Sequence, residues 1–217
     1  MGRFFSQDGA FFRIGTTAAD VAALGLLWLA ASLPLVTMGA ATTAVFYVAT
    51  KRAGGRDAYV WRDFWKSFRQ NFALSTTVFL TLAAIFALLA FNIQNMGFME
   101  VLADIALVVQ FFILIEAVFV ALYAFPIIAR FEMGYVQVLK TALFMANRHF
   151  LTTICLAALL AAVFFTSVVA TPLLIPVAMG IYSFPAAHLI VRVFKKHRAD
   201  FDAVKTDEPL EPLNFDD

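Results

Sequence analysis

The chain has 217 residues, of which 62% are hydrophobic and 14% charged, with a formal net charge of +1 at pH 7. Soluble domains contain roughly 45–50% apolar and about 25% charged residues, so this composition excludes an ordinary soluble fold and indicates a membrane protein. Residues 199–217 hold seven acids and one base, which leaves 15 bases and 8 acids elsewhere. Those bases flank apolar runs instead of forming one patch, which predicts contact with a membrane surface and not with nucleic acid.

The first apolar run, residues 21–50, contains no formal charge. A continuous helix of that length would measure about 45 Å, whereas the hydrocarbon layer is about 30 Å thick. Pro34 and Gly39 interrupt the run, because proline removes a backbone donor and clashes with the preceding turn. We therefore expect two short helices joined near Pro34–Gly39, the first beginning near Ile14 and the second ending near Thr50. One long first helix is the alternative.

The loop at 51–71 contains four aromatic residues at helical spacing, with charged residues between them: Trp61, Phe64, Trp65 and Phe68. This pattern predicts an amphipathic helix at the membrane interface, with its rings at the level of the headgroups.

Four further apolar runs, at 72–91, 105–128, 150–171 and 173–193, are each about long enough to span a bilayer. Pro126 and Pro185 lie within two of them and are expected to break those helices. A second cytoplasmic loop at 129–149 includes a weaker amphipathic segment. The predicted fold is an all-α transmembrane bundle with six crossings, the first two short.

The basic residues set the expected orientation. All 16 Lys and Arg fall in the N-terminus, the two loops and the C-terminal segment, whereas the turns near Pro34, 92–104 and 171–176 contain none. Since Lys and Arg accumulate on the cytoplasmic side, both termini and both loops are predicted to be cytoplasmic. Residues 1–198 form the predicted transmembrane domain, and 199–217 a disordered acidic tail.

Glu116 is the main candidate for a functional site within the membrane. It lies twelve residues after Asp104 and fourteen before Arg130, which places it near the predicted midplane, where a carboxylate costs about 2.5–3.5 kcal/mol. Glu116, Tyr123 and Arg130 are seven residues apart and share one stripe of a helix. Two interpretations stay open: an ion or proton site facing a polar cavity, or a glutamate that ties two helices together by a hydrogen bond.

Two short segments look like an internal repeat. Tyr123–Pro126 (YAFP) and Tyr182–Pro185 (YSFP) occupy similar positions in outward-to-inward helices. Each proline frees a carbonyl, which can bind an ion or be satisfied by a neighbouring Ser or Thr. Duplication and chance similarity both explain so short a match.

Three segments together resemble the YesL-like family of bacterial integral membrane proteins. They are DVAALGLLWLAASLPLVTMGAATTAVFY (20–47), RDFWKSFRQNF (62–72) and YAFPIIARFE (123–132). The resemblance implies a multi-pass protein of the bacterial plasma membrane, without an established activity and associated with ABC-type sugar uptake.

The functional expectation is a non-enzymatic accessory or scaffold protein linked to carbohydrate uptake. The alternative is a small-solute or ion-coupled transporter or channel that uses Glu116 and the proline-broken helices. No nucleotide-binding, hydrolase or metal-binding motif occurs, so we expect no enzyme activity, no cofactor and no metal. The expected partners are the lipid bilayer and, by the resemblance, ABC sugar-transporter subunits. A homo-oligomer is left open, and nucleic acid is not expected.

Overall fold

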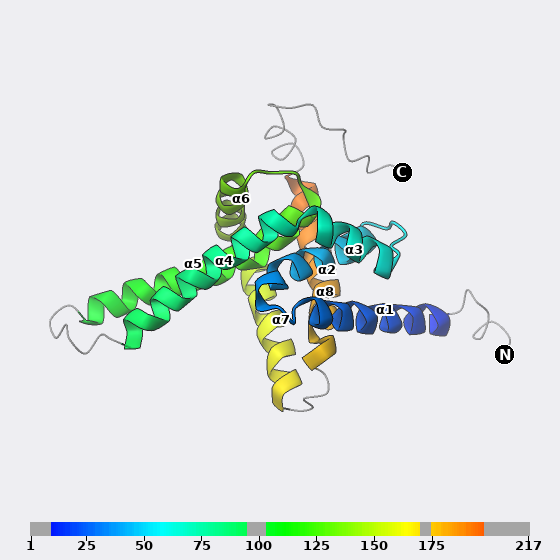
Figure 1. Cartoon of the computed structure of the whole chain (residues 1–217), viewed down its shortest axis with the longest axis horizontal. Helices are drawn as coiled ribbons and strands as arrows, with labels where there is room; N and C mark the ends of the chain where they lie inside the picture. Colours follow the sequence, from blue (N-terminus) through cyan, green and yellow to red (C-terminus); the bar gives the residue numbers. More distant parts are fainter. Residues whose placement is uncertain (1–9, 95–102, 170–174, 198–217) are drawn as a thin grey trace.

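The computed structural model describes residues 10–94, 103–169 and 175–197, and every regular element in these ranges is helical (Figure 1). The elements are α1 (Ala10–Ala31), the 3₁₀ turn η1 (Leu35–Thr37), α2 (Met38–Ala53), α3 (Val60–Gln70), α4 (Phe72–Gln94), α5 (Ala103–Arg130), α6 (Tyr135–Arg148), α7 (Phe150–Val169) and α8 (Ile175–Lys196). The predicted acidic tail at 199–217 lies outside the described residues.

The predicted break in the first apolar run is confirmed. α1 ends at Ala31, exposed Pro34 follows, and α2 begins at Met38. The Thr37 hydroxyl lies 2.7 Å from the Pro34 carbonyl and 2.5 Å from that of Ala31, so it supplies a donor where the end of α1 lacks one. The boundaries differ from expectation: α1 begins before Ile14, and α2 continues past Thr50 as far as Ala53.

Helix α2 lies at the centre of the molecule and packs against α1, α3, α4, α5 and α8 (Figure 1). Most of it is buried, and its buried residues include the small side chains of Ala40, Ala41 and Ala44. Small residues let neighbouring helices approach closely. At Gly39 an added Cβ would collide with the Ser75 carbonyl of α4. This helix is therefore enclosed by protein.

Four helices are long and apolar enough to cross a membrane: α4, residues Ile105–Arg130 of α5, α7, and residues Val177–Lys196 of α8. They coincide with the four apolar runs predicted after residue 71 and confirm a helical membrane-type fold. In α1 the apolar segment Gly15–Ala31 is shorter than these four. The six crossings and the orientation stay predictions. The α4–α5 and α7–α8 hairpins project in different directions (Figure 1).

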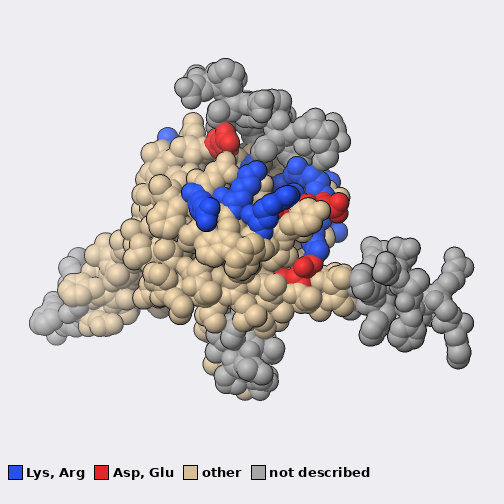
Figure 2. Space-filling view, turned by 45° about the vertical axis from the view of Figure 1, so that its right-hand side comes forward, with Lys and Arg blue, Asp and Glu red and all other residues tan. Residues whose placement is uncertain are grey.

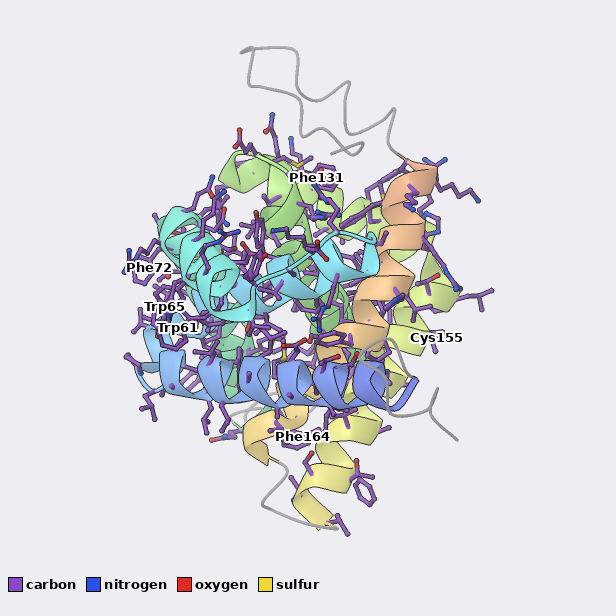
Figure 3. All side chains as sticks on the ribbon, turned by 90° about the vertical axis from the view of Figure 1, so that its right-hand side faces the viewer. Trp61, Trp65, Phe72, Phe131, Cys155 and Phe164 are labelled. Carbon is purple, nitrogen blue, oxygen red and sulfur yellow. The ribbon has the colours of Figure 1, made fainter. Side chains whose placement is uncertain are left out.

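The first helix crosses α8 instead of running alongside it, as two perpendicular views show (Figures 1 and 3). Glycines make this contact possible. An added Cβ at Gly180 would collide with the backbone of α1 at Val21 and would lie 3.1 Å from the Gly25 nitrogen. The crossing joins α1 and α8, the first and last helices of the described residues, through close contact of their backbones.

The order of elements repeats once along the chain. α3, α4 and α5 form one triplet and α6, α7 and α8 a second, each with a short helix, an apolar helix and a proline-containing helix. One residue, Asn71 or His149, separates the first two helices of each triplet. Helix α6 runs back along α4 and α5. The hydroxyl of Tyr135 on α6 lies 2.8 Å from the hydroxyl of Thr81 on α4.

Candidate functional site

Glu116 lies on α5 and is partly buried. Its carboxylate accepts a 3.1 Å hydrogen bond from the side-chain amide of Asn147, an exposed residue near the end of α6. Nearby on α5, the ring of Phe119 meets the ring of Phe150, the first residue of α7, with centres 6.1 Å apart. The part of α5 around Glu116 therefore meets the junction of α6 and α7, and the position of Glu116 near the membrane midplane stays a prediction.

Tyr123 is fully buried, and its hydroxyl lies 3.3 Å from the hydroxyl of Thr153 on α7. Thr153 also lies 2.7 Å from the carbonyl oxygen of Ala146 on α6. The Thr153 hydroxyl therefore donates towards acceptors on two other helices, the Tyr123 hydroxyl of α5 and the Ala146 carbonyl of α6. This arrangement ties α5, α6 and α7 together.

Arg130, the last residue of α5, directs its guanidinium towards the end of α2, where Nη2 lies 3.5 Å from the Thr50 carbonyl. A cation is favourable there because a helix C-terminus carries partial negative charge. Glu116, Tyr123 and Arg130 thus contact α6, α7 and α2 respectively. The structure does not gather the predicted stripe into one polar site.

A cluster of charged residues surrounds the end of α2, and we call it the α2 latch: Asp20, Lys51, Arg52 and Asp63. Lys51 and buried Asp63 form an ion pair of 2.8 Å, and Asp63 also accepts a 3.0 Å bond from the Tyr59 backbone N–H. Arg52 pairs with Asp20 of α1. Sequence reasoning missed both pairs; the signal for Asp63 was a lone acid between aromatic and basic residues.

In the structure α1 begins at Ala10, so Asp20 lies well inside the helix, where its partner is Arg52. Lys and Arg gather on the face shown in Figure 2, whereas the described parts of the projecting hairpins show few charges there. The α2 latch therefore joins α1, α2 and α3 on the charged part of the molecule.

The four aromatic residues assigned to the membrane interface do not share one environment. Phe64 is fully buried against α2, so this ring contacts protein and is not available to the headgroups at which it was expected. Trp61 is exposed by 67%, and Trp65 and Phe68 are partly buried. The rings form a continuous series, with centres 6.0 Å apart for Trp61–Trp65 and 5.3 Å for Trp65–Phe68. Contact of this series with lipid stays a prediction.

The four positions at which helix breaks were expected fall into two groups. Pro34 lies in the break before α2, and Gly39 lies in the first turn of α2. In contrast, α5 and α8 continue as helices through Pro126 and Pro185. The surrounding packing maintains these helices although proline supplies no N–H, so the two inner prolines are not interruptions.

A histidine pair that the sequence did not suggest lies where α7 begins and α8 ends. His149 Nε2 and His197 Nδ1 are 3.4 Å apart, with the rings edge to face and their centres 4.8 Å apart. Burial, assisted by the nearby cations Lys196 and Arg148 and by His197, lowers the pKa of His149 below its ordinary value of 6.5. Among the described residues, no group of three His, Cys, Asp or Glu could hold a metal ion.

Residues 21–93 match the family model described as "Protein of unknown function, DUF624". No curated protein and no solved structure matches the chain. The DUF624 match runs from α1 through α4, so it includes the break, α2, α3 and most of the α2 latch, but not Glu116, Tyr123 or Arg130. The YesL-like resemblance is compatible with this match.

Proposed function

We propose that the protein is a non-enzymatic accessory or scaffold component of the membrane that associates with a carbohydrate-uptake system. The link to carbohydrate uptake rests on the YesL-like resemblance. The scaffold role is supported by one observation on the structure: many hydroxyl groups within the four apolar helices bond inside or between helices, whereas buried polar atoms of Thr76, Gln110 and Tyr182 have no hydrogen-bond partner among the described residues. A transporter would instead need a connected polar path through the membrane.

The hydroxyl groups of the apolar helices illustrate this use. In α4 and α7, Thr77, Thr81 and Thr166 each donate to a carbonyl four residues earlier, at 2.9, 2.9 and 2.6 Å. Ser167 and Ser183 likewise bond to carbonyls of their own helices. Such back-bonding satisfies a hydroxyl locally, and these groups then need no solute or water as a partner.

Large apolar side chains dominate the exposed surface of the same helices. The exposed residues include Phe111 and Phe112 on α5 and Phe164 and Phe165 on α7, each by more than half. Surfaces of this kind suit lipid chains or the helices of a partner, because helices associate in membranes mainly through van der Waals packing. This favours association through helix surfaces over transport through the molecule.

One observation favours the alternative, a small-solute or ion-coupled transporter or channel. The hydroxyl of Tyr182 is buried and has no hydrogen-bond partner among the described residues. Leaving a buried hydroxyl unsatisfied costs about 1–3 kcal/mol, and a water or polar solute would remove that cost. Tyr182 and Tyr123 belong to one buried cluster, so such a solute would lie between the two proline-containing helices.

Substitution of Glu116 separates the two functions. Glu116→Gln keeps an acceptor for Asn147 but abolishes the titratable charge. If the protein is a scaffold, the Gln variant and Glu116→Leu both remain folded and active, with stability changes of roughly 0.6 kcal/mol and at most about 2. The measurements are the melting temperature in detergent and sugar-dependent growth. A folded Gln variant without activity would refute the scaffold and support a transporter.

Purification of the full chain in mild detergent provides the direct test of association. The scaffold proposal expects transporter subunits to co-purify with the wild type and with both Glu116 variants. Asp57→Ala, which changes an exposed acid far from Glu116 in the sequence, is the matched control. Transporter subunits are expected to co-purify with this variant as well. A wild-type protein that purifies alone after mild cross-linking in cells would contradict the proposal.

A further inference from the structure

Helix α3 presents a different chemistry on each of three sides. One side, with Asp63, Phe64 and Ser67, is buried against the protein. A second carries the ring series Trp61, Trp65 and Phe68, and the third carries the cations Arg62, Lys66 and Arg69. Residues spaced by three or four share one side of a helix, so each set forms a continuous stripe.

The cationic stripe faces away from the protein. The side chain of Arg62 is 70% exposed, and Lys66 and Arg69 are also exposed. The neighbouring acid, Asp63, lies 3.9 Å from the Arg62 guanidinium, but it is buried and has its closer ion pair with Lys51 at 2.8 Å, so it neutralises little of this charge. Within the described part of the chain, Lys66 and Arg69 form no ion pair. The stripe is therefore available to an external anion.

The aromatic stripe fixes the level of this charge relative to the membrane. Phe68 contacts Phe72, the first residue of the apolar helix α4, with ring centres 5.6 Å apart. One residue, Asn71, separates α3 from α4. Figure 3 shows Trp61, Trp65 and Phe72 at the same edge of the molecule. If α4 spans the bilayer, α3 lies at its surface, where aromatic rings and headgroups meet.

We propose that α3 is a binding surface for anionic phospholipid headgroups, with the lipid phosphates at Arg62, Lys66 and Arg69 and the aromatic stripe at the acyl-chain boundary. Clustered cations directly beside a spanning helix are suited to anionic lipids. The corresponding helix of the second triplet, α6, lacks this arrangement. It has only two cations, Lys140 and Arg148, which are eight residues apart and form no stripe of three.

The test uses the full-length protein in phosphatidylcholine vesicles that contain a minor fraction of acyl-brominated phosphatidylglycerol. Bromine quenches tryptophan fluorescence on contact, and two of the three tryptophans, Trp61 and Trp65, lie on α3. The same fraction of brominated phosphatidylcholine gives the reference. We expect phosphatidylglycerol to be enriched at α3, which stronger quenching by the brominated phosphatidylglycerol than by the reference lipid would show. The double variant Lys66→Gln/Arg69→Gln is expected to reduce that enrichment severalfold, by up to about fivefold for each cation.

The matched control is Lys140→Gln/Lys195→Gln, which removes two exposed cations from α6 and α8. This control keeps the enrichment of the wild type if α3 is the binding surface. Equal losses in the two double variants would show a response to net charge and overturn the proposal, as would no loss in either. Truncation after Arg198 tests the acidic tail. Strong enrichment that appears only after truncation would make the tail, and not lipid, the occupant of α3 in the full chain.

Discussion

At the scale of single residues, Asp63 has the clearest structural role. Asp63→Ala leaves Lys51 and the Tyr59 N–H without their acceptor, and hydrogen bonds to charged groups contribute about 1.5–3 kcal/mol. We expect the variant to unfold at a clearly lower temperature in detergent. Asp57→Ala removes an exposed acid from the same loop and is expected to change stability by less than about 0.5 kcal/mol. Equal melting temperatures would show that the α2 latch contributes little.

The histidine pair predicts a dependence of stability on pH. The pKa of His149 is lowered in the folded protein, so the folded state binds fewer protons than the unfolded state as the pH falls below about 6.5. The stabilisation is present above that pH and is lost on acidification through the folded pKa. We expect the melting temperature to fall between about pH 7 and 5.

Substitution tests the assignment of this pH dependence to the pair. His149→Gln should flatten the dependence, because residue 149 then no longer titrates beside His197. His188→Gln replaces an exposed histidine of α8 and should leave the slope as in the wild type. A slope that is unchanged in His149→Gln would attribute the effect to other groups.

The sequence identified Glu116, Tyr123 and Arg130 as polar residues that need partners, but it could not supply those partners. Spacing by seven places residues on one stripe of an isolated helix. The partners Asn147, Thr153 and Thr50 come from three other helices, and their positions depend on how α6 and α7 pack on α5. The burial of Phe64 was missed for the same reason, since composition alone does not say which side of α3 meets α2.

At the scale of helices, the crossing of α1 and α8 is the contact most sensitive to an added methyl group. Gly180→Ala places a Cβ against the Val21 carbonyl, a backbone atom that cannot move aside alone. Overpacking usually costs about 1–3 kcal/mol. Gly15→Ala has open space around its Cβ and should be neutral or stabilising. Comparison of their melting temperatures in detergent tests the contact, and equal values would contradict it.

Helices were more predictable than contacts because their signals are local. The long apolar runs gave α4, α5, α7 and α8, and Pro34 gave the break before α2. Pro126 and Pro185 were misleading, since a proline inside a well-packed membrane helix does not have to end it. The path of α6 along α5 was not predictable, because an amphipathic pattern does not distinguish a lipid surface from a protein surface.

For the whole molecule, the predicted topology places both termini in the cytoplasm. Cysteines introduced at Ser6 and Thr206 in a background with Cys155→Ala test it, because Cys155 is the single native cysteine and is exposed. Six crossings predict that membrane-impermeant reagents label neither site in intact cells and both after permeabilisation. Labelling at Ser6 from outside would refute six crossings and favour five.

The contact between α1 and α8 also has a consequence for biosynthesis. Val21 and Gly180 are separated by 159 positions in the chain, and translation proceeds at roughly 5–20 residues per second. The ribosome therefore completes α8 about 10–30 s after it completes this part of α1. During that interval the side of α1 that finally meets α8 has no native partner. This side of α1 is thus packed late, although α1 also contacts α2 and α3, and an insertase or chaperone can act on it during the interval.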